Sequence, residues 1–191
     1  MQKLGLFGGS FDPVHHGHLL MAQAAREELG LDRLYFILAA QSPFKPDAKP
    51  APANERLRLL RLALAGREWC ELDSQEIQRG GVSYTIDTVR DYARRFPGAE
   101  LFYLVGADNV LTLPKWREAT ELAKLATFVA IPRPGDPAVP FPAPFKGTTL
   151  RGFPFGVSSS QIRTRVKEGL PIDHLTPPAV AEAVRNYGLY K

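Results

Sequence analysis

Residues 8–18 read Gly-Gly-Ser-Phe-Asp-Pro-Val-His-His-Gly-His and directly follow a short apolar run at residues 4–7. This order is typical of a strand, then a glycine loop, then a histidine-rich segment that opens a helix. Glycine has no Cβ to keep an anion away from the backbone, and the first N–H groups of a helix have no partner within the helix. The stretch therefore predicts a phosphate-binding site at the start of a β-α unit.

Beyond this stretch, apolar runs and helical patterns alternate along the chain. Residues 17–29 place their apolar side chains on one helical face, and Gly30 is a typical helix stop. Residues 34–38 are a continuous apolar run, which is typical of a strand that is buried on both faces of a parallel sheet. Together with the strand at residues 4–7, these two segments predict a βαβ unit.

The remaining elements repeat the same alternation. Further strands are expected at residues 69–72, 101–105, 128–131 and 148–153. Further helices are expected at residues 54–65, with Asn54 as N-cap, and at residues 85–95, 110–113, 116–123, 158–168 and 177–186. Segments rich in proline or glycine predict loops at residues 41–53, 73–83 and 132–147. The pattern predicts one α/β domain over residues 1–191, with a Rossmann-like open, mostly parallel sheet, helices on both of its faces and a C-terminal helical segment.

The composition of the chain excludes several classes of protein. The chain has 191 residues, a formal net charge of +4 and a single cysteine, Cys70. One cysteine excludes an intrachain disulfide framework and a thiolate-rich metal site, and it favours a reducing compartment, so we expect a cytoplasmic protein. No apolar stretch approaches the roughly 20 residues of a bilayer helix, so no membrane partner is expected. The net positive charge fits either an anionic small substrate or nucleic acid, but the basic residues are dispersed, as on an ordinary mildly basic surface, so the charge alone decides little.

Two histidines of the opening stretch are candidates for handling phosphate. His15 and His18 are three residues apart at a predicted helix start, where side chains at that spacing share a face. Both could therefore donate to one phosphate group. Two other interpretations stay open: His15, His16 and His18 could hold a metal ion with Asp12, or the histidines could simply cap the helix.

A second candidate anion site lies far along the chain, where residues 157–163 read Val-Ser-Ser-Ser-Gln-Ile-Arg. Hydroxyls and free N–H groups at a helix start can hold an anion, and an arginine one turn later can bridge two phosphate oxygens with its planar guanidinium. The alternative interpretation is an ordinary serine N-cap with a surface arginine.

Both stretches resemble the signatures of the HxGH nucleotidyltransferase superfamily. Residues 15–18 match HxGH, and residues 157–163 resemble the second signature, ISSTxIR, with Ser160 in place of threonine. The whole of residues 8–18 resembles the opening of the bacterial nicotinate-nucleotide adenylyltransferases, which usually have threonine at the position of Ser10. The resemblance extends from about residue 4 to residue 187, and it implies that the two histidines bind the phosphates of ATP.

Further segments of the resemblance concern the second substrate. Residues 79–88 resemble the R-x-G-x-S-Y-T-x-D-T segment that holds the pyridine nucleotide in that family, and residues 106–109 resemble its GAD segment, whose aspartate accepts from ribose hydroxyls. Trp116 would stack on the pyridine ring, although a tryptophan packed between helices is the alternative. Lys45 stands in the family's Pro-His-Lys loop, where Phe44 replaces the histidine, and Arg133 matches its RPG turn.

The resemblance implies a complete set of site residues. The catalytic residues would be His15, His18, Lys45 and Arg163. ATP would contact Gly8, Gly9, Ser10, Phe11, His15, His18, Gly106, Asp108, Ser158, Ser159 and Arg163. Nicotinate mononucleotide would contact Ser10, Lys45, Tyr84, Thr85, Trp116 and Arg133.

The implied reaction transfers AMP from ATP to the phosphate of nicotinate mononucleotide and gives deamido-NAD and pyrophosphate. A phosphate monoester is mostly dianionic near pH 7, so this nucleophile needs no general base. Mg²⁺ is expected on the ATP phosphates, without a metal ligand from the protein, because the site offers few carboxylates. The expected partners are ATP and nicotinate mononucleotide, and the sequence is compatible with a homo-oligomer.

Other functions remain as alternatives. Phosphopantetheine adenylyltransferases share the HxGH opening and the serine-rich second signature, but the segment at residues 83–85 and Trp116 argue against that acceptor. A nucleotide-binding module without catalysis, or a nucleic-acid-binding protein that uses its basic surface, would belong to different classes. Nicotinate and nicotinamide mononucleotide are not separated by the sequence, since backbone donors near Thr85 would serve either ring substituent.

Overall fold

The computed structural model describes residues 1–41, 49–132, 135, 139–153 and 155–191. Lys45 and Arg133, two of the expected substrate contacts, lie outside these described residues. The strands are β1 (Lys3–Gly9), β2 (Arg33–Leu38), β3 (Cys70–Asp73), β4 (Glu100–Gly106), β5 (Thr127–Ile131) and β6 (Gly147–Thr149). The helices are α1 (His16–Leu29), α2 (Ala53–Leu64), α3 (Gln75–Arg79), α4 (Thr85–Arg95), α5 (Ala107–Val110), the 3-10 helix η1 (Leu113–Lys115), α6 (Ala119–Leu125), α7 (Ser159–Lys167) and α8 (Pro178–Asn186).

The strands of the described residues form one six-stranded sheet in the order β3-β2-β1-β4-β5-β6, and every pair is parallel. This confirms the expected Rossmann-like α/β fold. The strand order reverses between β1 and β4, which is where open α/β sheets bind their ligands, beyond the carboxyl ends of the strands. β1 stays paired with β2 up to Gly9 and Leu38 but with β4 only up to Leu6 and Tyr103. The two central strands therefore separate at this edge.

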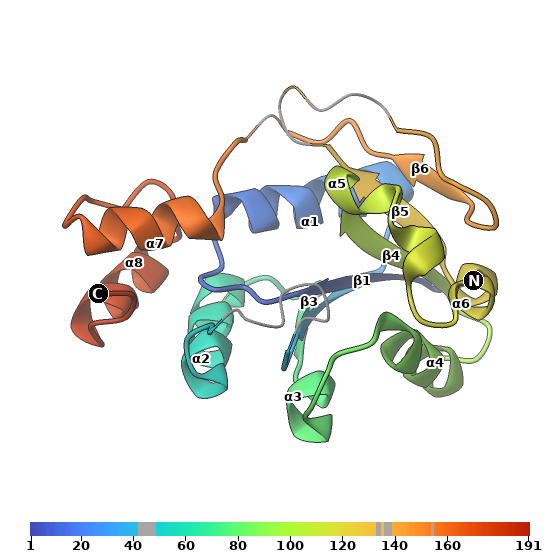
Figure 1. Ribbon diagram of the computed structural model, residues 1–191, viewed down its shortest axis with the longest axis horizontal. Coiled ribbons are helices and arrows are strands. Elements are labelled where there is room, and N and C mark those ends of the chain that lie inside the picture. Colours follow the sequence, from blue (N-terminus) through green and yellow to red (C-terminus); the bar gives the residue numbers. More distant parts are fainter. Residues whose placement is uncertain (42–48, 133–134, 136–138, 154) are drawn as a thin grey trace.

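Side chains on the strands build an apolar layer on each face of the sheet. Successive side chains of a strand point to opposite faces, so Leu34 and Phe36 join one cluster while Tyr35 and Ile37 join the other. The first cluster includes residues of α1, α2, α7 and α8, and the second includes residues of α4 and α6. Figure 1 shows α1 and α4 on opposite sides of the sheet. Burial on both faces explains why the strands read as continuous apolar runs.

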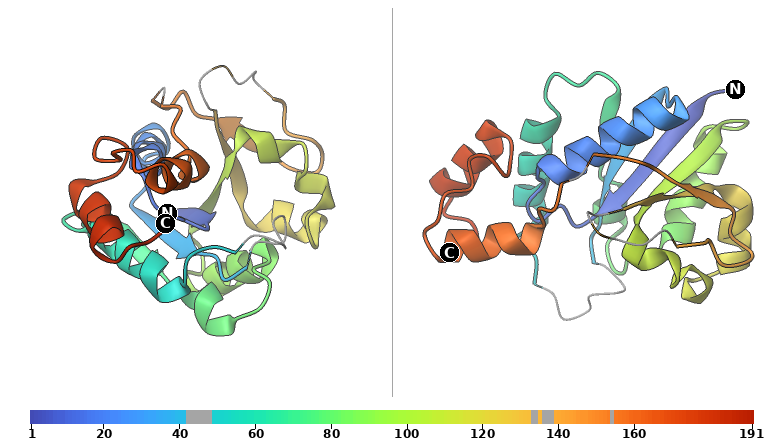
Figure 2. Two further views of the ribbon diagram at one scale, coloured as in Figure 1. Left: turned by 60° about the vertical axis from the view of Figure 1, so that its left-hand side comes forward. Right: turned by 90° about the horizontal axis from the view of Figure 1, so that it is seen from above.

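Several element boundaries confirm the expectations from sequence. α4 spans Thr85–Arg95 as predicted. Gly30 caps the end of α1 as predicted: its backbone is left-handed (φ 66°), and its N–H donates to the Arg26 carbonyl. At one side of the sheet, where β1 ends, α7 and α8 lie close together (Figure 2). No helix in the described ranges is long and apolar enough to cross a membrane.

Other boundaries differ from the predictions. Gly8 and Gly9 belong to β1 and not to a loop, because both still pair with β2. Pro52 is the N-cap residue of α2, whereas the Asn54 side chain donates to Glu55, so the expected Asn54 cap is wrong. Residues 73–83, expected to be a loop, contain α3, which is too short to show a helical period in the sequence.

The second half of the chain departs from prediction at its short elements. The helices expected at residues 110–113 and 116–123 are in fact α5, η1 and α6, and each begins or ends several residues away from the expected bounds. β6 covers only Gly147–Thr149 instead of residues 148–153, because the backbone of Arg151 and Gly152 turns away and donates to the Glu28 carboxylate. These segments lie at an edge of the sheet or after β4, where few cross-strand partners constrain them.

Candidate active site

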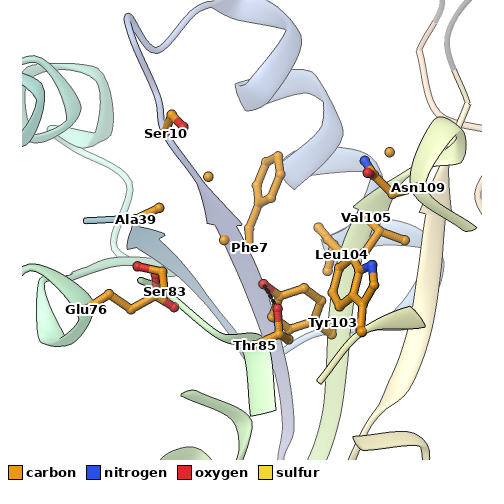
Figure 3. A pocket seen from close by; sticks show the side chains of 14 residues that line it. Phe7, Ser10, Ala39, Glu76, Ser83, Thr85, Tyr103, Leu104, Val105 and Asn109 are labelled. Atoms are coloured by element: carbon orange, nitrogen blue, oxygen red, sulfur yellow. Dashed lines mark hydrogen bonds between the residues drawn. The ribbon is translucent and has the colours of Figure 1, made fainter. Parts of the chain in front are cut away.

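A cavity of about 240 Å³ opens at the carboxyl ends of β1 and β4, close to the lower end of the size range of small-molecule sites. Figure 3 shows that side chains from β1, β4 and the segment between α3 and α4 point into it. Its lining consists of Phe7, Gly8, Gly9, Ser10, Ala39, Glu76, Ser83, Thr85, Tyr103, Leu104, Val105, Gly106, Asn109 and Trp116. The expected site residues Gly8, Gly9, Ser10, Thr85, Gly106 and Trp116 are among them.

The floor of the cavity depends on the missing side chain of Gly8. A Cβ at Gly8 would lie 2.4 Å from the Tyr103 hydroxyl oxygen, so only glycine leaves room for that phenol. Thr85 Oγ1 donates to the same hydroxyl at 3.3 Å (Figure 3). Burial, together with the nearby Glu76 charge, raises the pKa of Tyr103, which therefore stays a neutral phenol. Gly8 thus lets a strand backbone, a phenol and a helix start meet at one point.

A buried carboxyl group lies in the wall of the cavity. Glu76 is 4% exposed and accepts from the hydroxyl of Thr88 at 2.5 Å. Burial raises the pKa of Glu76, although hydrogen bonds from Thr88 and Ser83 oppose that shift. Ser83 in turn accepts from the backbone N–H of Ala40 at 3.0 Å. This network fixes the segment before α4 against the end of β2.

The turn after β1 is held by a buried aromatic ring and a buried guanidinium. Phe11 is 2% exposed, packs edge to face against Phe7 and His18, and has a left-handed backbone (φ 44°) that is unfavourable for a residue with a Cβ. The buried guanidinium of Arg56 donates from Nη1 to the carbonyls of Ser10 and Ala39 at 2.9 and 3.0 Å. Because the Phe11 ring is buried, a ligand that reaches this residue would meet its backbone, and a contact between Phe11 and ATP stays a prediction.

The two signature histidines lie against each other. Their rings stack with centroids 3.8 Å apart, and the His15 backbone N–H donates to His18 Nδ1 at 3.2 Å. Since Nδ1 is the acceptor, the proton of a neutral His18 ring resides on Nε2, which is then a donor. A Cβ at Gly17 would lie 2.9 Å from the His15 ring, so the glycine of the motif makes room for that imidazole.

Helix capping and metal binding are the two alternative roles of the histidines. His15 is the N-cap residue of α1, and the bond from its backbone to His18 is one half of a capping arrangement, so capping does occur. His16 instead faces the ring of Phe155, edge to face at 6.5 Å. Across the described residues, no group of three or more histidine, cysteine, aspartate or glutamate side chains could hold a metal ion. The zinc interpretation therefore has no supporting cluster there.

The start of α7 meets the turn after β1, which joins the two candidate anion sites. Ser159 Oγ donates to the Pro13 carbonyl at 2.9 Å, and Arg163 Nη1 donates to the Asp12 carbonyl at 2.8 Å. Ser158 is the N-cap residue of α7, where its hydroxyl accepts from the N–H of Gln161 at 3.2 Å. The ordinary N-cap interpretation therefore describes Ser158, whereas Ser159 and Arg163 contact the first motif directly.

The other expected substrate residues surround the cavity to different degrees. Trp116 lines the cavity, donates from Nε1 to Thr112 Oγ1 at 3.2 Å and packs edge to face against Tyr103, while its stacking on a pyridine ring stays a prediction. Tyr84 is the N-cap residue of α4, with its ring under the Arg117 guanidinium at 4.7 Å, outside the cavity lining. Asp108 is exposed just beyond β4 and accepts from the Asn109 amide at 3.0 Å.

Three side chains that shape the site were not predicted from the sequence. Glu76 lies in a helix of five residues that reads as a loop, and Tyr103 lies inside an apolar strand, so neither carries a local signal. Arg56 does carry one: it lies three and four residues before the buried Leu59 and Leu60, on the apolar face of α2. A cation on that face indicates a buried side chain that must be hydrogen-bonded or paired.

Comparisons with known proteins identify the family of the chain. The model of the cytidylyltransferase-like family matches residues 6–165. The chain is 42% identical over 189 residues to a probable nicotinate-nucleotide adenylyltransferase of Thermus thermophilus, covering 99% of this chain and 100% of that protein. It is 38% identical to the protein of the same name from Bacillus pumilus, covering 100% of both chains.

Among solved structures, the fold is similar to Plasmodium falciparum nicotinic acid mononucleotide adenylyltransferase complexed with NaAD. The TM-score is 0.80 at 18% identity, with 100% of this chain and 98% of that chain covered. At this identity the similarity concerns the fold alone. Because the family model spans most of the chain and the bacterial relatives align with its full length, the chain belongs to the cytidylyltransferase-like family, among the nicotinate-nucleotide adenylyltransferases.

Proposed function

We propose that the chain transfers AMP from ATP to the phosphate of nicotinate mononucleotide, giving deamido-NAD and pyrophosphate. The observation that carries the proposal is the contact of α7 with the turn after β1, through Ser159 and Arg163, beside a cavity lined by Thr85 and Trp116. The two candidate anion-binding motifs and a pocket with an aromatic wall meet at the edge of the sheet where ligands of this fold bind. The names of the bacterial relatives support the same reaction.

ATP would bind between the turn after β1 and the start of α7. Gly8, Gly9 and Ser10 offer backbone groups, and the Nε2–H of His18 is a preorganised donor because its Nδ1 is already engaged by the backbone. The Arg163 side chain is 35% exposed, so part of its guanidinium can reach a phosphate. The first-motif histidines would then address the α-phosphate region, while Arg163 holds the leaving pyrophosphate.

Nicotinate mononucleotide would occupy the cavity at the start of α4. The ring would lie against Trp116, and the backbone N–H groups that open α4 at Thr85 would face the ring carboxylate, which the positive end of a helix dipole favours. Lys45 and Arg133 remain proposed phosphate contacts outside the described residues. Discrimination between nicotinate and nicotinamide would depend on how these N–H groups prefer a carboxylate over an amide.

The chemistry would be a direct displacement at the α-phosphorus of ATP. A phosphate oxygen of the mononucleotide forms the new P–O bond while the bond from the α-phosphorus to the bridging oxygen breaks, and pyrophosphate leaves with that electron pair. No proton has to be removed from the nucleophile near pH 7. The protein's part is to position two polyanions in line and to stabilise the charge that moves to the leaving group.

We propose that Mg²⁺ arrives as part of the ATP substrate. The described residues hold no cluster of metal ligands, and the donors around the turn after β1 are N–H groups, imidazoles and a guanidinium, which suit phosphate oxygens and not a hard cation. When bound, the ion would neutralise charge on the phosphates. Asp12 is engaged by Arg163 and Tyr190, which argues against a direct role as metal ligand.

Substitution of Trp116 tests the acceptor site. Trp116→Ala should raise the KM for nicotinate mononucleotide about tenfold or more, since aromatic stacking on a base is worth about 1–3 kcal/mol, while the KM for ATP stays near its normal value. The matched control is Trp69→Ala, which removes a partly buried tryptophan that contacts Arg26 far from the cavity. Steady-state kinetics with each substrate varied in turn would check this. An equal rise in both KM values would contradict the stacking role.

A further inference from the structure

The segment that follows α8 folds back and reaches the turn after β1. The Leu189 N–H donates to the Val184 carbonyl at 3.0 Å, and Leu189 and Tyr190 pack against the apolar cluster of α1, α2 and α8. From this position the Tyr190 hydroxyl donates to Asp12 Oδ1 at 2.8 Å, across 178 residues of sequence. The segment after α8 is thereby linked to the turn that is proposed to hold ATP.

Asp12 is a desolvated carboxylate that this tyrosine shares with an arginine. Asp12 is 6% exposed, and its Oδ1 also accepts from the Ala51 N–H at 3.1 Å. Its Oδ2 lies 3.7 Å from Nη1 of Arg163, the nitrogen that donates to the Asp12 carbonyl. Tyr190 and Arg163 therefore contact opposite oxygens of one buried carboxylate.

A hydrogen bond from the Tyr190 hydroxyl would weaken the attraction of Asp12 for Arg163. A buried carboxylate with fewer neutral donors draws a neighbouring cation more strongly, because the low local dielectric strengthens the attraction. Without the hydroxyl, Asp12 would pull the guanidinium into a closer ion pair and away from the space in front of α7. Burial and the Asp12 charge raise the pKa of Tyr190, so the hydroxyl keeps its proton throughout the physiological range.

We propose that Tyr190 is a positioning residue for ATP binding: its hydroxyl holds the Asp12 carboxylate and thereby sets where the Arg163 guanidinium lies. The inference rests on the proposed function only in requiring that Arg163 contacts the ATP phosphates. It assigns a role to the segment after α8, which the two nucleotide signatures do not include.

The test uses Tyr190→Phe, which removes the hydroxyl and keeps the buried ring. The dissociation constant for MgATP, measured by titration calorimetry, should rise about tenfold, the effect of one hydrogen bond to a charged group. The KM for nicotinate mononucleotide should stay unchanged. The matched control is Tyr187→Phe in the same segment, because Tyr187 is 55% exposed, contacts Arg58 and should bind MgATP like the wild type.

A second variant separates positioning from a general loss of structure. In an Asp12→Asn background the attraction on Arg163 is gone, so adding Tyr190→Phe should change the MgATP dissociation constant less than twofold. The inference is overturned if Tyr190→Phe binds MgATP like the wild type, if both substrates weaken equally, or if its effect is the same in both backgrounds.

The same measurements distinguish this inference from the proposed function. If the wild type binds MgATP but does not adenylylate nicotinate mononucleotide, the proposed reaction fails while the comparison of MgATP dissociation constants still decides the role of Tyr190. If the wild type catalyses the reaction and Tyr190→Phe leaves the MgATP dissociation constant unchanged, only the positioning role fails.

Discussion

The two imidazoles of the HxGH segment can stack because the residue beside them has no side chain. A Cβ at Gly17 would meet the His15 ring at 2.9 Å, and displacing that ring would disturb its stacking on His18. The spacing in the sequence predicts a shared helical face for the two histidines. Only the structure adds that a backbone N–H engages His18 Nδ1 and so directs the ring proton to Nε2.

Removal of one imidazole tests this arrangement. His18→Ala should lower kcat by about 10²- to 10³-fold, as expected when one preorganised donor to a developing charge is lost, with a much smaller effect on the KM for nicotinate mononucleotide. Steady-state kinetics beside His174→Ala, which removes an exposed histidine on the segment between α7 and α8, would provide the comparison. A variant with near-normal turnover would show that His18 does not act on the reacting phosphates.

Other single residues show where sequence reasoning stops. Arg56 could have been recognised, because a lone cation on the apolar face of α2 indicates a buried partner. Tyr190 could not, because its partner Asp12 is 178 residues away and no local pattern links them. Local patterns in the sequence predict which chemistry is present, whereas the partners of a side chain depend on tertiary contacts.

The connection between β6 and α7 is tied to α1 by one carboxylate. Glu28 Oε2 accepts from the Arg151 N–H at 3.0 Å, and Oε1 accepts from the Gly152 N–H at 2.9 Å. Burial raises the pKa of Glu28, but these two donors together with the Arg151 charge lower it more, so the net shift is downward. The Arg151 side chain is 93% exposed and contributes little as an ion pair. These two hydrogen bonds, which we call the Glu28 clamp, let α1 restrain the segment that leads to Ser158.

Neutralising this carboxylate should reduce stability in a pH-dependent way. Glu28→Gln should lower the free energy of unfolding at pH 7 by roughly 1 kcal/mol, because one accepting oxygen and the charge are lost. Since the folded-state pKa is lowered, the contribution of Glu28 is present above the unfolded pKa of about 4.5 and is lost as the pH falls below it. The difference between the two proteins should therefore shrink between about pH 5 and about pH 3.

Urea unfolding at several pH values would measure this difference. Glu27→Gln is the control, because the Glu27 side chain accepts only an exposed bond from Gln23 in the described part of the chain. If the difference in unfolding free energy between the wild type and Glu28→Gln stays constant across this pH range, the proposed role of the Glu28 clamp is contradicted.

Long periodic patterns predict their elements well, and short elements leave little pattern to read. The sequence predicts α4 with its bounds, because eleven residues show both a helix start and an amphipathic face. It does not predict α3, since five residues cannot show a helical period. The same holds at the edge of the sheet, where β6 has only three residues and a single neighbouring strand.

The position of the site follows from the order of the whole sheet. β1 lies between β2 and β4, and it separates from β4 beyond Leu6 and Tyr103 while it remains paired with β2. Alternating apolar runs and helices predict a parallel sheet but not which strands are neighbours. The strand order brings together the turn after β1, the start of α4 and the end of β4, although the first of these is separated from the other two by roughly 75 to 100 residues along the chain.

Adenylyl transfer to a pyridine mononucleotide is tested most directly by pyrophosphate release from MgATP with the purified chain. Nicotinate mononucleotide, nicotinamide mononucleotide and phosphopantetheine would be compared side by side, with the products identified by mass spectrometry. We predict deamido-NAD from nicotinate mononucleotide, with kcat/KM at least about 10²-fold above that for phosphopantetheine. Equal or faster release with phosphopantetheine, or no release with either mononucleotide, would contradict the proposed function.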